Sequence, residues 1–340
     1  MVRIPRSTRI ALLAAASTIL AQGQSGPASA EQDAQKERTN FHDVMSAEAR
    51  SPQLCLSRPN RAYVTHRYGS SCMAYFVTSG HQAQRQAVVF IDGDISGDRY
   101  DKRASDPDGN LTTRQRAQKI ADKFKVRVIV ISRMGIDGSS GNHGSRRRPV
   151  ELMAITETLD VIKSRLGLDR VVLAGQSGGS TIAASLLTLG RKDISCAVLG
   201  SGAYALNDML AISAIAKGRK PNREMLAKTV YDPTRNIATI HADPKRRVFV
   251  LGDPQDARTP FAQQKAFAAA IAARGHTAEL LEVLASGPLH HGATAYTLPV
   301  AALCAADAPS ERIRKGILKH KGHEIERRNK VKSALLTVAR

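Results

Sequence analysis

Short apolar runs alternate with longer amphipathic stretches along most of the chain. The runs are rich in Val, Ile and Leu and are typical of buried strands, at residues 87–91, 126–132, 171–173, 194–199, 247–251 and 278–284. The stretches between them favour helices, at residues 112–124, 151–168, 178–189 and 260–273. Strands that alternate with long helices indicate βαβ units, so we expect an α/β fold with a mostly parallel central sheet flanked by helices.

Residues 203–245 interrupt this alternation. They lie between two predicted strands and contain short helical stretches. The segment could be a small cap inserted over a site or an elongated connection without that role, and the sequence favours neither. With this segment included, the globular domain is predicted to span residues 51–310.

The N-terminus has the layout of a secretory signal peptide. Three arginines within the first nine residues precede an apolar stretch at residues 10–21, and Ala-Ser-Ala at residues 28–30 supplies a small-residue cleavage site. We therefore predict a signal peptide over residues 1–30 and a periplasmic or secreted protein, the alternative being an amphipathic first helix. Residues 31–50 are polar without a sustained period, which predicts a flexible lead-in.

Export implies an oxidising compartment in which cysteines can pair. Cys55 and Cys72 lie close in sequence around a turn-rich segment, and we expect a disulfide between them. Cys196 lies in an apolar run and is expected to be a buried free thiol, with pairing to Cys304 as the alternative.

The formal charge of +20 is concentrated in short basic runs, at residues 146–148 and 245–247 and in a basic tail over residues 311–340. The simplest interpretation is a solvated surface; the tail could add weak association with anionic surfaces. Its charge density favours a mobile segment over a helix. The sequence contains no recognisable nucleic-acid-binding module, so no specific nucleic-acid partner is predicted.

One motif carries candidate chemistry. Gly175-Gln176-Ser177-Gly178-Gly179 follows a predicted strand directly and precedes a predicted helix. A serine at such a tight turn holds its hydroxyl above the sheet, and the helix that begins there directs backbone N–H groups at a developing oxyanion. Ser177 is therefore the candidate nucleophile.

A serine nucleophile requires a base and an acid that orients the base. Asp253 and Asp256 follow the strand at residues 247–251, and His290 and His291 follow the strand at residues 278–284. Both candidate pairs come after the serine, in the order acid and then histidine.

These residues resemble the α/β-hydrolase superfamily, and within it the prolyl-oligopeptidase-like and esterase-like branches, over about residues 60–305. The resemblance implies the α/β-hydrolase fold, no metal and no organic cofactor. Family members often have G-x-x-D-x-x-V-P after the strand that precedes the acid. Asp256 stands four residues before Pro260, as that pattern expects, although the gap from the glycine to the aspartate is one residue longer here. Asp256 is therefore preferred to Asp253. His291 precedes a glycine, as the family's catalytic histidine commonly does, and is preferred to His290.

The resemblance also implies an oxyanion hole formed by the N–H of Gly178 and one from the loop after residues 87–91, for which Asp94 is the candidate. Many relatives have His-Gly there, and an acidic side chain beside an oxyanion is unfavourable unless it points away or is paired. Arg133 or residues 146–148 could pair with it. Residues 132–141 resemble a family loop near the site, which makes Ser139 and Ser140 candidate pocket-wall residues.

Together these features predict a serine hydrolase that cleaves a small ester or a peptide through an acyl-enzyme. A prolyl-oligopeptidase-like peptidase is the first alternative, because triad residues do not determine the substrate. The second alternative is a catalytically inactive binding protein on the same fold.

Overall fold

The computed structural model describes residues 48–81, 83–95 and 111–338, with side chains described to residue 330. The predicted signal peptide and most of the predicted lead-in, residues 1–47, lie outside the described residues. Their assignment stays a prediction.

The described strands form an eight-stranded sheet in the order β1-β2-β4-β3-β5-β6-β7-β8. The strands from β4 to β8 along this order are parallel, whereas β2 is antiparallel to both of its neighbours. Their bounds are Arg61–His66 (β1), Gly69–Val77 (β2), Gln86–Ile91 (β3), Val128–Ile131 (β4), Arg170–Gln176 (β5), Ile194–Gly200 (β6), Arg247–Gly252 (β7) and Thr277–Glu282 (β8). The predicted mostly parallel sheet is confirmed.

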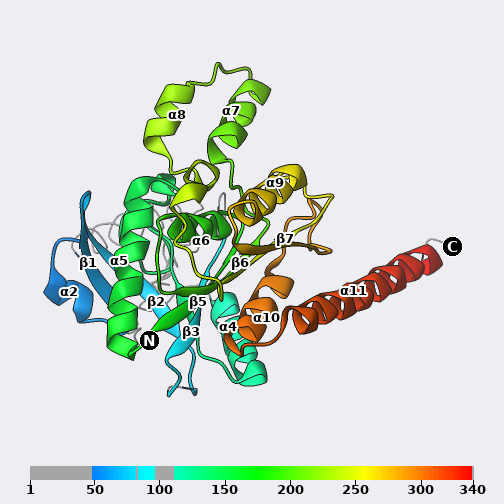
Figure 1. The fold of residues 1–340 in the computed structure, drawn as a ribbon, viewed down its shortest axis with the longest axis horizontal. Coiled ribbons are helices and arrows are strands. Elements are labelled where there is room, and N and C mark those ends of the chain that lie inside the picture. The colour runs from blue at the N-terminus through cyan, green and yellow to red at the C-terminus, as the bar shows by residue number, and fades with distance from the viewer. Residues whose placement is uncertain (1–47, 82, 96–110, 339–340) are drawn as a thin grey trace, which may run out of the picture. The chain divides into compact units, whose positions relative to one another are not determined.

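Helices cover both faces of the sheet (Figure 1). Alternate side chains of β3 show why: Val89 belongs to a core cluster that includes residues of α5, α6 and α9, whereas Val88 belongs to one that includes residues of α4, α10 and α11. The strands β3 to β7 are therefore buried on both sides, as Val- and Ile-rich runs require. The helix bounds are Pro52–Leu56 (α2), Leu111–Phe124 (α4), Pro149–Leu166 (α5), Gly178–Thr188 (α6), Leu206–Ala216 (α7), Arg223–Thr229 (α8), Phe261–Ala272 (α9), Thr294–Ala305 (α10) and Ser310–Val338 (α11).

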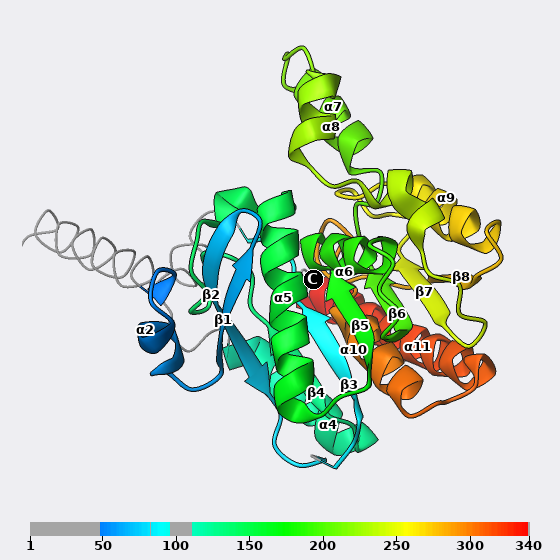
Figure 2. The same cartoon turned by 60° about the vertical axis from the view of Figure 1, so that its left-hand side comes forward.

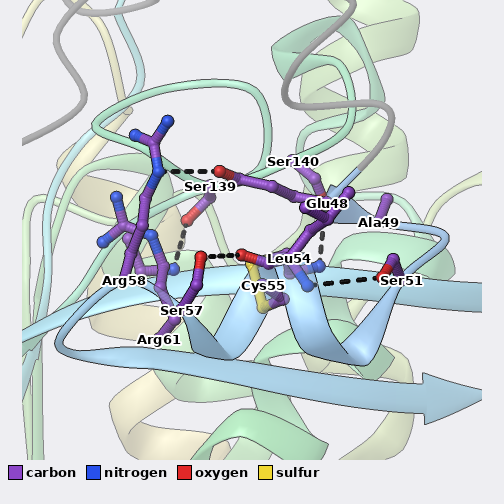
Figure 3. Close-up of a disulfide and its surroundings, with 12 residues drawn as sticks. Glu48, Ala49, Ser51, Leu54, Cys55, Ser57, Arg58, Arg61, Ser139 and Ser140 are labelled. Atoms are coloured by element: carbon purple, nitrogen blue, oxygen red, sulfur yellow. Dashed lines mark hydrogen bonds and ion pairs between the residues drawn. A yellow bond between two sulfur atoms is a disulfide. The ribbon is translucent and has the colours of Figure 1, made fainter.

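Helix α2 is attached to the β1–β2 hairpin by a disulfide. Cys55 in α2 is bonded to Cys72 in β2, the pairing expected from the sequence. Figure 3 shows the same corner further closed by an ion pair of 2.8 Å between Glu48 and Arg58. The side chain of Ser51 caps α2 by accepting the N–H of Leu54. The cross-link fixes a helix that is too short to be stable alone.

The prediction for Cys196 is wrong. Cys196 in β6 forms a disulfide with Cys304 at the end of α10, with a Cα–Cα distance of 6.5 Å. The physical reason is that α10 packs across β5 and β6, which brings two thiols 108 residues apart in sequence into reach of each other. The spacing of the cysteines in the sequence could not predict this pairing.

The interruption at residues 203–245 consists of α7, α8 and a 3₁₀ segment, Pro233–Thr239. Figures 1 and 2 both show α7 and α8 extending away from the sheet. A role as a cap and a role as an elongated connection both stay open. The sequence favoured a mobile segment for the basic tail. Instead, most of the tail forms the helix α11.

In the described part of the chain, no helix is both long enough and apolar enough to span a membrane.

Candidate active site

Ser177 occupies a strained turn between β5 and α6. Its φ is +55° and its ψ is −121°, a backbone conformation that a non-glycine residue rarely adopts. The turn is tight enough to need glycine around it: a side chain at Gly175 would overlap the backbone of Gly179, and one at Gly179 would overlap the backbone of Ile91. This packing lifts the serine hydroxyl to the carboxyl end of the sheet, as the motif predicts.

Ser177, His291 and Asp256 form a continuous hydrogen-bonded chain. Ser177 Oγ lies 2.8 Å from His291 Nε2, and His291 Nδ1 lies 2.9 and 3.0 Å from the two carboxylate oxygens of Asp256. A carboxylate can only accept here, so Nδ1 carries the proton and Nε2 is left to accept the serine hydroxyl. The structure thus brings together the three residues preferred from the sequence.

The Asp256 carboxylate is held in its ionised form. Burial alone would raise its pKa, but the hydrogen bond from His291 and the backbone N–H groups of Thr259 and Arg258 hold it below its ordinary value. The hydroxyl of Thr259 donates a further bond of 2.8 Å. Asp256 is therefore both charged and fixed in orientation, as an acid that orients an imidazole must be.

The two alternative residues have other positions. Asp253 accepts the N–H of Gln255 at 2.9 Å and the N–H of Ala285 at 2.8 Å. It therefore ties the loop between β7 and α9, the acid loop, to the start of the loop between β8 and α10, the histidine loop. His290 lies beside it, with Nδ1 3.5 Å from the carboxylate of Asp253. Neither contacts Ser177, and the structure does not bring them into the triad.

Gln176 fixes the histidine loop to the serine turn. Its side-chain amide donates to the carbonyl oxygen of His291 at 2.7 Å and accepts the N–H of Ala293 at 3.0 Å. The residue that precedes the nucleophile therefore holds the backbone that directly follows the base, at the carbonyl of His291 and the N–H of Ala293. Sequence reasoning treated Gln176 as a variable position of the motif; its amide, directly beside the serine, was the signal available.

The loop after β3 packs directly against the serine turn. A Cβ at Gly93 would lie 3.2 Å from the carbonyl oxygen of Gln176 and 3.3 Å from the Cβ of Ser177, closer than ordinary contact, so the loop lies directly on the turn. Asp94 follows, and its carboxylate is paired with Arg133 at 3.1 Å and with Arg147 at 3.2 Å. Burial opposes the charge, but these arginines hold the pKa of Asp94 below its ordinary value. The acidic side chain that departs from the family pattern is thus neutralised.

Two buried groups hold this loop in place. Arg133 is fully buried and makes a paired contact with Glu151 at 2.6 and 2.7 Å while it also donates to the carbonyl oxygen of Asp92 at 3.3 Å. His143 Nε2 accepts the N–H of Ile95 at 3.3 Å, and its Nδ1 lies 3.2 Å from the carbonyl oxygen of Met134. Burial, together with the charge of Arg133, lowers the pKa of His143 to about 4.

A cleft of about 480 Å³ lies above Ser177. Its wall includes apolar residues, Ile95, Pro288 and Leu289, and two arginines, Arg116 and Arg258. It also includes Gly93, Asp94, Gln176, Ser177 and His291, so the hydroxyl and the loop after β3 open into one space. Sequence reasoning missed the two arginines, because only the packing of α4 and of the acid loop around the serine places them there.

The prediction that Ser139 and Ser140 line the pocket is wrong. Both are buried, and their hydroxyls accept the backbone N–H groups of Ala74 and Cys72 in β2, at 3.0 and 2.9 Å. The loop at residues 132–141 turns toward β2, a strand that the sequence analysis did not predict, so these serines bond to the sheet and do not line the site.

Among the residues that the structure describes, no group of three or more His, Cys, Asp or Glu side chains has the arrangement of a metal site.

Solved structures with the same fold are hydrolases of low sequence identity. An esterase of Pyrococcus furiosus is 11% identical with a TM-score of 0.50, over 75% of this chain and 92% of the esterase. Est1E from Butyrivibrio proteoclasticus is 11% identical with a TM-score of 0.50, over 73% of this chain and 98% of Est1E. Prolyl oligopeptidase B from Galerina marginata is 12% identical with a TM-score of 0.51, over 73% of this chain and 36% of that enzyme.

No protein-family model and no curated protein matches the sequence. At these identities the structural likeness establishes the fold: the chain has the α/β-hydrolase fold, and the predicted resemblance is confirmed at that level.

Proposed function

We propose that the protein is a serine hydrolase that cleaves an ester or amide bond through an acyl-enzyme. The observation that carries the proposal is the hydrogen-bonded chain from Ser177 through His291 to Asp256, with each link between 2.8 and 3.0 Å. Ser177 and His291 both line one cleft. The fold, shared with esterases and a prolyl oligopeptidase, supports the same reaction class.

Acylation begins at Ser177. His291 Nε2 takes the hydroxyl proton as Oγ attacks the carbonyl carbon of the substrate, and Asp256 stabilises the imidazolium that forms. The tetrahedral intermediate then expels an alcohol or an amine, which receives the proton from Nε2. Because Asp256 is held ionised by His291, Thr259 and Arg258, it can supply this stabilisation throughout the cycle.

The oxyanion is assigned to two backbone N–H groups. Gly178 is the first residue of α6, so its N–H has no partner within the helix and lies at the positive end of the helix dipole. Asp94 is assigned as the second donor, because its loop packs on Ser177 and its carboxylate is neutralised by Arg133 and Arg147. A water activated by His291 then hydrolyses the acyl-enzyme by the same steps in reverse order.

Ester and amide substrates distinguish an esterase from a peptidase. We expect turnover of 4-nitrophenyl butyrate, and the experiment compares it with the matched butyryl 4-nitroanilide and with short aminoacyl anilides. Activity on esters alone supports an esterase, and comparable activity on the anilides supports the peptidase alternative. A Ser177→Ala variant that folds but hydrolyses none of them is the required control.

The inactive binding protein is the weaker alternative. A binding role would not require a strained serine, a bonded imidazole and an ionised carboxylate in one line, since the strain costs on the order of 1–3 kcal/mol. If the wild-type protein hydrolyses none of these substrates at a rate above that of Ser177→Ala, the binding alternative gains support.

We further propose that the protein is exported and acts in the periplasm or outside the cell. The layout of residues 1–30 and the two disulfides support this assignment, because disulfides persist in oxidising compartments. N-terminal sequencing of the protein from a periplasmic or culture fraction tests it: export with processing gives a start near residue 31, and retention gives an uncleaved Met1.

A further inference from the structure

The guanidinium groups of two cleft arginines have no partner in the described part of the chain. Arg116 lies on α4 and Arg258 lies in the loop between β7 and α9, and both line the cleft above Ser177. Against residues 48–81, 83–95 and 111–330, neither guanidinium forms an ion pair or a hydrogen bond, and both residues are exposed. Their positive charges are therefore available to a ligand.

Within the described residues, the two carboxylates that line the same cleft form no ion pair with Arg116 or Arg258. Asp92 accepts the hydroxyl of Thr113 at 2.9 Å and the N–H of Gly93 at 2.8 Å. Asp94 is paired with Arg133 and Arg147. The charge of Asp94 is thus compensated on its own side of the cleft, whereas Asp92 is held by two neutral donors.

Some exposed arginines elsewhere are paired and others are not. A carboxylate lies within 3.0 Å of Arg85, Arg223, Arg314 and Arg327, whereas Arg219 and Arg312 form no ion pair within the described residues. One unpaired arginine on an open surface is therefore no indication of a binding site. Two on the walls of one cleft, beside the candidate nucleophile, create a positive potential at the point where a substrate enters.

We infer that this cleft takes substrates that carry an anionic group, with Arg116 and Arg258 as the residues that select for it. The inference rests on the proposed hydrolase function and adds its substrate class. A guanidinium presents paired N–H donors that match a carboxylate or another oxyanion. Ile95, Pro288 and Leu289 provide apolar contacts for the remainder of the substrate. The anionic group lies on the acyl side or on the leaving-group side of the scissile bond.

Two pairs of esters test the two sides. For the acyl side, 4-nitrophenyl hydrogen adipate is compared with 4-nitrophenyl hexanoate, which has an acyl chain of the same length without the carboxylate. For the leaving-group side, 4-acetoxybenzoate is compared with its methyl ester. The quantity measured is the ratio of kcat/KM for the acid to that for its neutral partner, in the wild-type chain and in Arg116→Gln and Arg258→Gln. Differences in intrinsic reactivity cancel because each variant meets the same two esters.

Arg274→Gln is the matched control. Arg274 is also an exposed arginine without an ion pair in the described residues. It lies between α9 and the start of β8, at the amino end of that strand, whereas the cleft lies at the carboxyl ends of the strands. The Arg274→Gln substitution removes one positive charge from the protein and leaves the charge of the cleft unchanged. Since all three side chains are exposed, we expect each variant to fold, and far-ultraviolet circular dichroism checks this.

In at least one substrate pair, we expect each cleft variant to lower the ratio about three-fold, and the double variant about ten-fold, in the range of exposed ion pairs. Arg274→Gln should leave the ratio within about 1.5-fold of wild type. An increase in ionic strength from about 0.02 to 0.5 M should reduce the wild-type ratio, because the Debye length shortens from roughly 20 to 4 Å.

Ratios that are the same in wild type, both cleft variants and the control, for both pairs, overturn the inference. In that case turnover of the neutral esters would leave the proposed hydrolase function intact. If the wild type hydrolyses neither member of either pair faster than Ser177→Ala, the failure is that of the proposed function itself.

Discussion

The contact between Gln176 and the histidine loop gives the sharpest test of how the site is assembled. Replacement of Gln176 by Met keeps an unbranched side chain of similar size but removes both hydrogen bonds, to the carbonyl oxygen of His291 and from the N–H of Ala293. Gln176 is 7% exposed and Ala293 is fully buried, so solvent does not readily replace either bond.

The magnitude follows from those two bonds. An ordinary hydrogen bond contributes about 1 kcal/mol, and a buried N–H left without an acceptor costs about 1–3 kcal/mol. Gln176→Met should therefore lower the free energy of unfolding by roughly 2–4 kcal/mol. Because the freed loop carries His291, and a displacement of about 1 Å can cost about 10²-fold in rate, kcat should fall by up to two orders of magnitude with a smaller change in KM.

The assay combines urea unfolding with steady-state kinetics on 4-nitrophenyl butyrate, at a temperature where every variant is folded. Gln255→Met is the control, because Gln255 is exposed in the acid loop and its side chain makes no hydrogen bond within the described residues. A folded Gln176→Met protein with kcat within two-fold of wild type would refute the reasoning that this amide positions the base.

Three further predictions concern the groups around the site. Asp256→Asn should lower kcat by about 10⁴-fold, whereas Asp253→Asn should lower it by no more than about ten-fold and should mainly reduce the melting temperature; kinetics and calorimetry separate them. The pKa of His143 is lowered by burial to about 4, so the unfolded chain gains its proton first, and stability should fall by roughly 3 kcal/mol as pH drops from about 6.5 to 4. Urea unfolding of His143→Gln at pH 7 and 4.5 should lack this part of the slope, and an unchanged slope would contradict the assignment. Replacement of Cys196 and Cys304 by Ala should cost about 4 kcal/mol of unfolding free energy, because the bond closes a loop of 108 residues; a loss below about 1 kcal/mol would argue against the pairing.

The parallel part of the sheet was predictable because its strands are buried on both faces. Runs such as residues 87–91 must be apolar throughout when helices cover both sides, and that pattern is readable in one sequence. The β1–β2 hairpin was missed because β2 begins with Gly-Ser-Ser-Cys, small residues whose strand conformation depends on partners such as Ser139 and Ser140. Helix α10 was missed as well; it contains Pro299, which local propensity disfavours and tertiary packing tolerates.

The candidate site divides in the same way. Ser177 was readable because its turn imposes glycine on both sides, and Asp256 and His291 because each follows a strand at a spacing that the family resemblance favours. The pairing of Asp94 was left open in the sequence, since residues 133 and 147 reach it only through folding. Arg116 lies beyond any motif, because its place in the cleft depends on how α4 packs.

Reaction of Ser177 with a fluorophosphonate tests the central claim most directly. The wild-type chain should gain one phosphonyl group in its intact mass, with the adduct mapped to the peptide that contains Ser177, and labelling should be abolished in Ser177→Ala and strongly slowed in His291→Ala. A folded wild-type protein that remains unlabelled, or one labelled equally after Ser177→Ala, would contradict the account.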